Sequence, residues 1–273
     1  MKVEDMPLVT VITPCYNDGS YILACVKSVQ DSDYSRIEHI IVDDGSDAKT
    51  KTILSQINYP NVKVIYQSNK GVCEARNVAI RQAQGKFILP VDGDDKIGPH
   101  YISQAVRIFN ENSNVRLVTS EICQKFDRSN DKLIVSENID IGTLLSRNLM
   151  HISTLFRRED ALNVGCFDED FRIGLEDWAF WVSLLELGGI VGIVPGTNTY
   201  YRVKKFHRNN SFPSETQRML VKLIWTKHKT LYSQYYADPY ETDAYISLKQ
   251  LENMSLFKMA ILRMRQWIRK SIL

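Results

Sequence analysis

The sequence predicts an α/β fold in which a mostly parallel central sheet is covered by helices on both faces. Short, apolar, β-branched runs alternate with segments of helical periodicity over the first 122 residues. Several of these runs end in polar clusters, as the strands of open parallel sheets do. The chain has 273 residues, enough for one large α/β domain or a domain with an appendage. Alternating strands and helices need crossover connections, which favour parallel pairing.

The expected elements follow from the spacing of the apolar residues. Strands are expected at residues 8–13, 38–43, 62–66, 87–91, 116–122 and 191–194. Helices are expected at residues 21–30, 46–57, 72–84, from Pro99 onward, and 176–187. We expect Ser46 to cap the second of these helices and Gly85 to stop the third.

The pattern becomes less regular after Ile122. The polar stretch 125–138 is expected to form a loop or a short β-excursion, and the chain reads as helical from about Phe212 onward. We therefore expect a domain at residues 1–212 and a helical C-terminal extension at 213–273. Its last part, residues 256–273, has the spacing of a basic amphipathic helix.

Composition excludes several classes of protein. The formal net charge is +2, so the molecule as a whole is not expected to bind nucleic acid. The five cysteines are scattered without a C-x-x-C pair, which predicts reduced thiols and argues against a zinc site. No apolar run approaches the roughly 20 residues that span a bilayer, and the N-terminus lacks the regions of a signal peptide. A cytoplasmic protein is the expectation.

Three polar clusters stand at the carboxyl ends of expected strands, where open parallel sheets bind their ligands. They are residues 14–17, 43–46 and 92–95. The last contains Asp92, Asp94 and Asp95 within four positions, and clustered carboxylates repel one another unless a cation lies between them. Mg²⁺ or Mn²⁺ suits oxygen ligands of this kind and commonly accompanies a diphosphate. The sequence therefore predicts a metal site that also holds a nucleotide.

Five motifs in order make residues 7–212 resemble the family-2 glycosyltransferases of the GT-A fold, whose sheet is Rossmann-like. They are Pro14-x-Tyr16-Asn17, Asp43-Asp44-Gly45-Ser46, Asn69-x-Gly71 with Ala75-Arg76-Asn77, Asp92-x-Asp94-Asp95, and Glu176-Asp177-Trp178. The resemblance implies an inverting enzyme that uses a divalent cation and a nucleotide-sugar donor, with a UDP-sugar expected. It also implies a nucleotide-binding half at about residues 1–122 and an acceptor-binding half at about 123–212.

The resemblance assigns nucleotide contacts to one edge of the sheet. The residues concerned are Thr13, Pro14, Tyr16, Asn17, Asp43, Asp44, Asn69, Gly71, Arg76 and Asp92. A carboxylate at a strand end can accept the ring N–H of uracil, so Asp43 or Asp44 suits that role, and Tyr16 can lie against the base. Structural alternatives remain: Tyr16 could simply pack, one aspartate could cap a helix, and Arg76 could pair with a neighbouring acid instead of a phosphate.

The resemblance also assigns the chemistry. Asp177 takes the position of the family's general base, and Glu176 would support it or steer the acceptor; acids at a helix start also simply complement the helix dipole. Metal ligands are expected at Asp94 and Asp92, with His207 as a third. Asp95 and Arg76 are expected to contact the donor sugar, and Arg202 and Lys204 the diphosphate. His151 is either an acceptor-site residue or a packed side chain.

The expected acceptor is a glycan or a lipid-linked saccharide, as in the synthesis of a bacterial surface polysaccharide. The basic tail could contact the inner face of the membrane, or it could dock on the catalytic domain or on a second copy in a homodimer. Two other functions remain open. A nucleotidyltransferase would use a similar sheet and metal, and a decayed scaffold would bind a sugar or a partner without turnover. The absence of a G-x-G-x-x-G turn after the first expected strand argues against a dehydrogenase.

Overall fold

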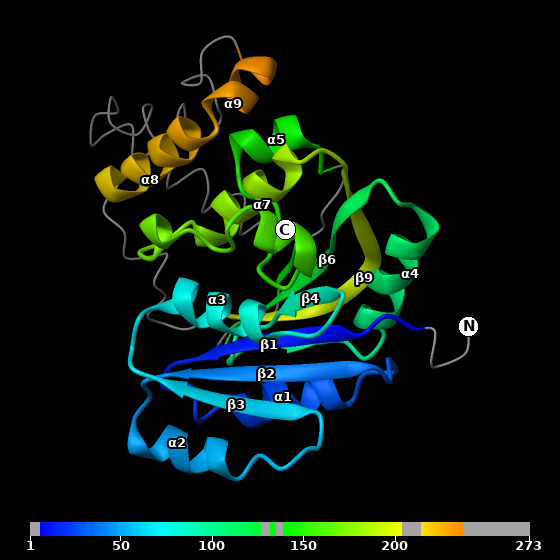
Figure 1. Cartoon of the computed structure of the whole chain (residues 1–273), viewed down its shortest axis with the longest axis vertical. Helices are drawn as coiled ribbons and strands as arrows, with labels where there is room; N and C mark the ends of the chain where they lie inside the picture. The colour runs from blue at the N-terminus through cyan, green and yellow to red at the C-terminus, as the bar shows by residue number, and fades with distance from the viewer. Residues whose placement is uncertain (1–5, 127–131, 135–138, 204–213, 237–273) are drawn as a thin grey trace, which may run out of the picture. The chain divides into compact units, whose positions relative to one another are not determined.

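The computed structural model describes residues 6–126, 132–134, 139–203 and 214–236 (Figure 1). The chain divides into two compact units, residues 1–144 with 148–211 and residues 145–147 with 212–273. The first unit contains the described strands. The second contains α8 (Ser214–Lys227) and α9 (Lys229–Tyr235), so the helices expected after Phe212 are present as far as Tyr235. The tail at 256–273 lies outside the described residues.

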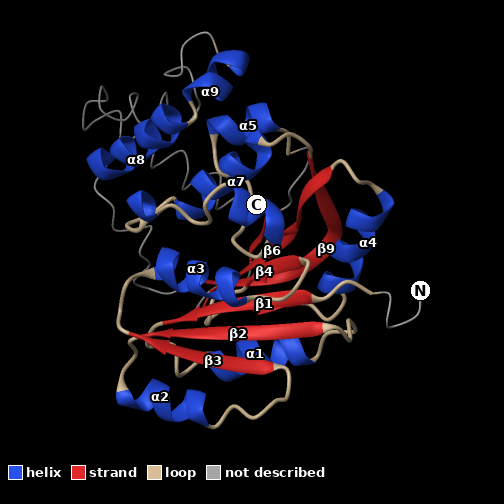
Figure 2. Cartoon of the chain, viewed as in Figure 1, coloured by secondary structure: helices blue, strands red, loops and turns tan. Residues whose placement is uncertain are grey.

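The described strands form one sheet with the order β3-β2-β1-β4-β8-β6-β9-β5, and β7 pairs with β6 (Figure 2). Their bounds are β1 Val9–Cys15, β2 Ile37–Asp44, β3 Val62–Gln67, β4 Phe87–Pro90, β5 Lys96–Ile97, β6 Val115–Phe126, β7 Lys132–Ile134, β8 Leu155–Arg157 and β9 Ile190–Val203. Strands β3, β2, β1 and β4 are parallel neighbours, and β6 is parallel to β9. The predicted mostly parallel sheet is thus confirmed. The antiparallel pairs made by β5 and β8 were not expected, whereas the pairing of β7 with β6 agrees with the β-excursion offered for residues 125–138.

The helices begin and end close to the expected positions. In the first unit they are α1 Ile22–Gln30, α2 Ala48–Ser55, α3 Val72–Gln82, α4 Tyr101–Glu111, α5 Ile141–Ser146 (which runs into the second unit), α6 Arg158–Asn163, the 3₁₀ turn Glu169–Phe171 and α7 Glu176–Glu186. Figure 1 shows α1 and α3 on opposite faces of the sheet. The prediction of helices on both faces is therefore confirmed.

Two predicted helix signals were wrong in detail. The N-cap of α2 is Asp47, whose side chain accepts the Thr50 N–H at 2.7 Å. Ser46 does not cap α2 because its hydroxyl accepts the Asn17 N–H at 3.0 Å. Gly85 does not end α3, which stops at Gln82. A Cβ at Gly85 would lie 2.6 Å from the Thr10 nitrogen, so this glycine permits a close approach to β1 instead.

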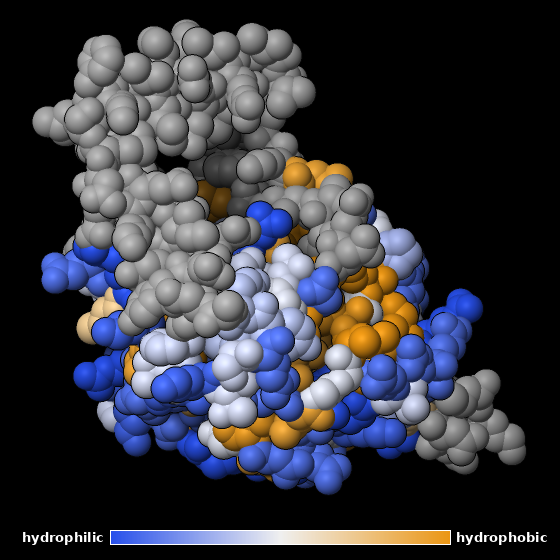
Figure 3. Space-filling view, turned by 90° about the horizontal axis from the view of Figure 1, so that it is seen from above, coloured by the Kyte–Doolittle hydropathy of each residue, from blue (hydrophilic) through white to orange (hydrophobic). Residues whose placement is uncertain are grey.

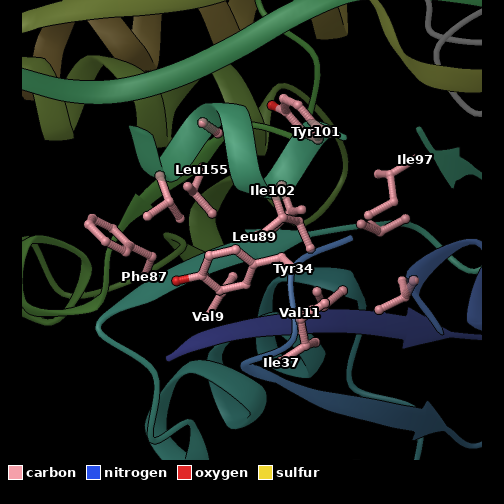
Figure 4. Close-up of a cluster of buried hydrophobic side chains, with 14 of the residues drawn as sticks. Val9, Val11, Tyr34, Ile37, Phe87, Leu89, Ile97, Tyr101, Ile102 and Leu155 are labelled. Carbon is pink, nitrogen blue, oxygen red and sulfur yellow. The ribbon is translucent and has the colours of Figure 1, made fainter. Parts of the chain in front are cut away.

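The main hydrophobic core lies between the sheet and helices α1 and α4. Val9 and Val11 of β1 face it together with Leu89 of β4, Ile102 of α4 and Leu155 of β8 (Figure 4). The alternate positions of β1 are buried on the other face, as expected for a strand covered on both sides. This double burial explains why β1 and β2 read as continuous apolar runs rather than alternating ones.

On the face seen in Figure 3, hydrophilic residues alternate with hydrophobic areas on the described part of the surface. The large hydrophobic side chains that stand exposed are Tyr16, Leu23, Tyr59, Tyr66, Leu133, Leu162, Ile173, Leu187, Ile190, Met219 and Tyr235. Among the helices of the described residues, none is long and apolar enough to cross a bilayer. All five cysteines are free thiols, and four of them are buried.

Candidate functional site

The turns after β1 and β2 are joined by hydrogen bonds. The Asn17 N–H donates to Ser46 Oγ at 3.0 Å, and Asn17 Oδ1 accepts the Asp47 N–H at 2.7 Å. Asn17 has φ 60°, a left-handed conformation that asparagine tolerates better than most residues. The order β2-β1-β4 places the ends of these strands next to the end of β4. The three clusters expected at strand ends therefore meet at one edge of the sheet.

The two aspartates that follow β2 have different surroundings. Asp43 Oδ1 accepts the Ser46 N–H at 3.1 Å within its own turn. Asp44 accepts Gln67 Nε2 and the main-chain N–H groups of Lys70 and Gly71, each at 2.8 Å. Both aspartates are buried. Asp44 therefore fixes the turn that contains Gly71, and neither aspartate caps α2.

Glycines allow these turns to pack. Gly45 has φ 77°, and a Cβ there would lie 2.7 Å from the Asn69 nitrogen. Gly71 has φ 95° and stands at the N-terminus of α3. Gly45 is needed both for its positive φ and for its close contact with Asn69, whereas Gly71 is needed for its positive φ alone. Asn69 itself is exposed at this edge.

The remaining residues expected at the nucleotide divide into exposed and buried ones. Tyr16 is 53% exposed, so the alternative that it packs in the core is wrong. Pro14 and Thr13 are buried, and Thr13 Oγ1 lies 2.9 Å from His39 Nε2. Burial lowers the pKa of His39 to about 3. The Thr13 side chain is therefore turned into the protein, and a contact with a nucleotide would have to come from its main chain.

Arg76 joins two of the acidic motifs. Its Nη2 lies 2.7 Å from Asp92 Oδ1, and its Nη1 lies 3.2 Å from Glu176 Oε1. The guanidinium is almost fully buried and lies 5.2 Å from the ring centre of Phe167. Burial by itself would lower the pKa of Arg76, but Asp92 and Glu176 together raise it above its ordinary value. The ion-pair alternative for Arg76 is what the structure shows, and it brings residues 92 and 176 into one site.

The three carboxylates after β4 face different ways. Asp92 and Asp94 are partly exposed, whereas Asp95 is buried. Asp95 Oδ1 accepts the Arg202 N–H at 2.9 Å, and Asp95 Oδ2 lies 3.5 Å from His151 Nε2. Asp95 thus links β4 to β9, while Asp92 and Asp94 can meet a ligand.

The donor set fits a hard divalent cation. Within the described residues no group of three or more acidic, histidine or cysteine side chains is arranged so that it could hold a metal ion by itself. Mg²⁺ is commonly held by one or two carboxylates that leave other positions to water and phosphate, and Asp92 and Asp94 are such a pair. His207, the expected third ligand, lies outside the described residues, as does Lys204.

Arg202 lies at the metal motif. Its Nε lies 3.3 Å from the Asp94 carbonyl oxygen, and its guanidinium lies 4.6 Å from the ring centre of Tyr21. The side chain is only partly buried. Its position beside Asp94 is compatible with the expected contact to a diphosphate.

Glu176 and Asp177 begin α7, directly after Leu175, which has φ 60°. Asp177 Oδ1 accepts the Trp178 N–H at 2.7 Å, and Asp177 Oδ2 accepts Asn148 Nδ2 at 3.0 Å. Loss of hydration and the neighbouring Glu176 raise the pKa of Asp177 to about 6. A carboxyl group with a pKa near the pH of its surroundings is suited to take up a proton.

The structure adds residues that the motifs did not include. Asn148 contacts Asp177, and His151 lies beside Asp95 and edge-on to Tyr201, with 5.0 Å between ring centres. Burial lowers the pKa of His151 to about 4, so the ring is neutral. Sequence reasoning had considered His151 without placing it, and no local pattern marks Asn148 or Tyr201.

Comparison with known proteins identifies the family. The model of "Glycosyl transferase family 2" matches residues 10–179. An uncharacterized glycosyltransferase of Haemophilus influenzae is 30% identical over 67% of this chain and 73% of the relative. The minor teichoic acid biosynthesis protein GgaB of Bacillus subtilis is 28% identical over 72% of this chain but only 23% of GgaB.

Two solved structures resemble the fold. Residues 1–349 of S. aureus TarS in complex with UDP-GlcNAc match with a TM-score of 0.65 and 22% identity, over 80% of this chain and 66% of that one. The mannosyltransferase PcManGT of Pyrobaculum calidifontis, in complex with GDP-Man and Mn²⁺, matches with a TM-score of 0.66 and 17% identity, over 97% and 81%. The chain belongs to glycosyl transferase family 2 and has the GT-A fold that its five motifs predicted.

Proposed function

We propose that this protein is an inverting glycosyltransferase that moves a sugar from a UDP-sugar to a hydroxyl group of a glycan or lipid-linked saccharide. The observation that carries the proposal is the bridge made by Arg76 between Asp92 and Glu176. It holds Asp92, one of the carboxylates suited to a cation, close to Glu176, the neighbour of the proposed base Asp177.

The nucleotide would bind at the carboxyl edge formed by the ends of β1 and β2. Tyr16 offers an exposed ring to the base, and the main chain of Thr13 with Pro14 and Asn17 would line the same place. Asp43 or Asp44 would accept the uracil N–H. Asn69 and Gly71 would contact the nucleotide from the turn that Asp44 holds. UDP bound to TarS and GDP-Man bound to PcManGT support a nucleotide-sugar donor.

Asp92 and Asp94 would hold Mn²⁺ or Mg²⁺, with His207 as a further ligand. The cation, when bound, supplies positive charge that stabilises the leaving nucleoside diphosphate. Arg202 and Lys204 would add charge on the same diphosphate. Asp95 and Arg76 are buried, so the donor-sugar contacts proposed for them would require a local rearrangement when the donor binds. The Mn²⁺ found with PcManGT supports this choice of metal.

In the transfer step, Asp177 accepts the proton of the acceptor hydroxyl. The hydroxyl oxygen attacks the anomeric carbon from the face opposite the diphosphate. The bond from that carbon to the diphosphate oxygen breaks with its electron pair, so the configuration inverts in one displacement. Glu176 supports the base, and its negative charge is held by Arg76.

A role in the synthesis of a bacterial surface polysaccharide agrees with the relatives, among which GgaB is named for teichoic acid biosynthesis. The halves at about 1–122 and 123–212 would bind donor and acceptor respectively. The tail at 256–273 would bring the enzyme to a membrane surface where a lipid-linked acceptor resides, or would dock on the enzyme or a second copy.

The test is release of the nucleoside diphosphate from a panel of UDP-sugars and GDP-mannose, with Mn²⁺ or with EDTA, by the wild type and Asp177→Asn. We expect one UDP-sugar to be consumed only with the metal, and the variant to be inactive while still binding UDP in calorimetry. Release of pyrophosphate from a nucleoside triphosphate would instead indicate a nucleotidyltransferase. Binding of a saccharide without turnover of any donor would indicate a binding module.

A further inference from the structure

The loop at residues 147–153, between α5 and β8, carries no motif of the family, yet it contacts the proposed base. Asn148 Nδ2 lies 3.0 Å from Asp177 Oδ2. Asn148 is exposed, and Asp177 is partly exposed. The amide of Asn148 therefore reaches Asp177 from an exposed loop.

The orientation of this amide is fixed by the loop itself. Asn148 Oδ1 accepts the Met150 N–H at 3.2 Å. Because a main-chain N–H can only donate, the atom facing it is the amide oxygen, and the atom facing Asp177 is the NH₂ group. The far end of the loop is held as well, since Tyr101 Oη donates to the Ser153 carbonyl at 2.6 Å.

Asp177 is surrounded by groups of both signs. Glu176 adds negative charge on the same helix, and Arg76 of α3 adds positive charge. Tyr201 of β9 interacts electrostatically with Asp177, Asp92, Asp94 and Asp95. The N–H groups of Asn148 and Trp178 favour the ionised carboxylate, against the loss of hydration. Of these two N–H donors, Trp178 belongs to α7 itself, whereas Asn148 belongs to a loop outside that helix.

We propose that Asn148 is a positioning residue for Asp177, orienting its carboxylate toward the acceptor hydroxyl and keeping it ionised. This inference rests on the proposed function for its catalytic meaning. The Asn148 amide fixes Oδ2 while the Trp178 N–H fixes Oδ1. The two donors together hold both oxygens of the carboxylate, and each oxygen keeps a lone pair for a further partner.

Two substitutions separate positioning from simple bracing of the loop. Asn148→Asp keeps the size of the side chain and the oxygen that accepts the Met150 N–H, but it places a second carboxylate against Asp177. Asn148→Ala removes both contacts. A bracing role predicts that the alanine variant is the more damaged, whereas a positioning role predicts that the aspartate variant is. Asn110→Asp, which adds the same charge at an exposed position of α4, is the matched control.

The first readout is the titration of the Asp177 carboxyl carbon by NMR, in protein labelled with ¹³C at the aspartate side chains and without substrate. The wild-type midpoint is expected at about 6. Asn148→Asp should raise it by about one unit and Asn148→Ala by roughly half a unit, with Asn110→Asp unchanged. The resonance is assigned by its loss in Asp177→Asn.

The second readout is the pH dependence of turnover for the donor found active. The acid limb should move to higher pH in the same order, and kcat should fall about tenfold or more in Asn148→Asp with little change in the donor KM. An Asn148→Asp protein whose Asp177 midpoint matches the wild type would overturn the inference. If the Asp177 midpoint shifts but the pH dependence of turnover does not, the contact between Asn148 and Asp177 is supported. The role of Asp177 as base would then be overturned.

Discussion

The turn after β2 and the start of α7 hold their carboxylates in opposite ways. Asp44 is buried and accepts three hydrogen bonds, two of them from main-chain N–H groups. Asp177 accepts two hydrogen bonds and has Glu176 beside it, and its pKa is raised to about 6. The first arrangement builds a rigid turn before any ligand arrives. The second arrangement gives a carboxylate a pKa close to neutral pH, which suits a group that takes up a proton.

The largest expected effect tests the functional half of this comparison. Asp177→Asn should lower turnover by about a thousandfold, because the amide cannot take the acceptor proton. UDP affinity measured by calorimetry should not change. Wild-type turnover should rise with pH through about 6 and then level off, because Asp177 must be ionised. Glu159→Gln, which changes an exposed acid in the first turn of α6, is the control and should stay near the wild type. More than a tenth of the activity left in Asp177→Asn would contradict the assignment.

The next largest effect concerns Arg76 of α3, which pairs with Asp92 and with Glu176 at the start of α7. Arg76→Met should lower the free energy of unfolding by about 3 kcal/mol, because it leaves Asp92 and Glu176 without their buried partner. Urea denaturation measures this. Arg81→Met on the same helix removes a half-exposed ion pair with Glu74 and should cost only about 0.5 kcal/mol. Equal losses in the two variants would mean that the Arg76 bridge adds nothing to stability.

A smaller effect tests the rigid turn. Asp44→Ala should cost about 2 kcal/mol, because the N–H groups of Lys70 and Gly71 lose their acceptor. UDP affinity should fall about tenfold, since the turn is no longer held in place. Asp47→Ala removes the cap of α2 and should leave UDP affinity unchanged, which calorimetry of both variants checks. A normal affinity in Asp44→Ala would show that the ligand itself can order this turn.

The smallest effect concerns the free energy of unfolding, which the raised pKa of Asp177 makes dependent on pH. The pKa of Asp177 rises from 3.8 to about 6 on folding, so the folded state binds the proton more tightly. The contribution of Asp177 to the free energy of unfolding therefore falls as pH rises from about 4 to 6 and is constant above. Asp177→Asn should be more stable than the wild type at pH 8, with the difference shrinking as the pH falls toward 4. A difference that does not depend on pH would mean that the charge is not its cause.

The spacing of apolar residues along the chain was enough to predict the regular part of the fold. Strands β1 to β4 and helices α1 to α3 are read from local spacing because each buried face repeats within a few residues. Strands β5 and β8 have two and three residues, too few to show a period, so they were missed. Their antiparallel pairing depends on partners far along the chain, which periodicity does not record.

The motifs likewise determined which residues meet at the edge of the sheet, because the carboxyl ends of neighbouring parallel strands must lie together. The contacts that those residues make with one another depend on packing between segments far apart in the chain. The pair of Arg76 with Glu176 spans 100 positions, and Asn148 reaches Asp177 from a loop without any motif. Burial and neighbouring charge raise the pKa of Asp177, and both arise from segments that pack together only after folding.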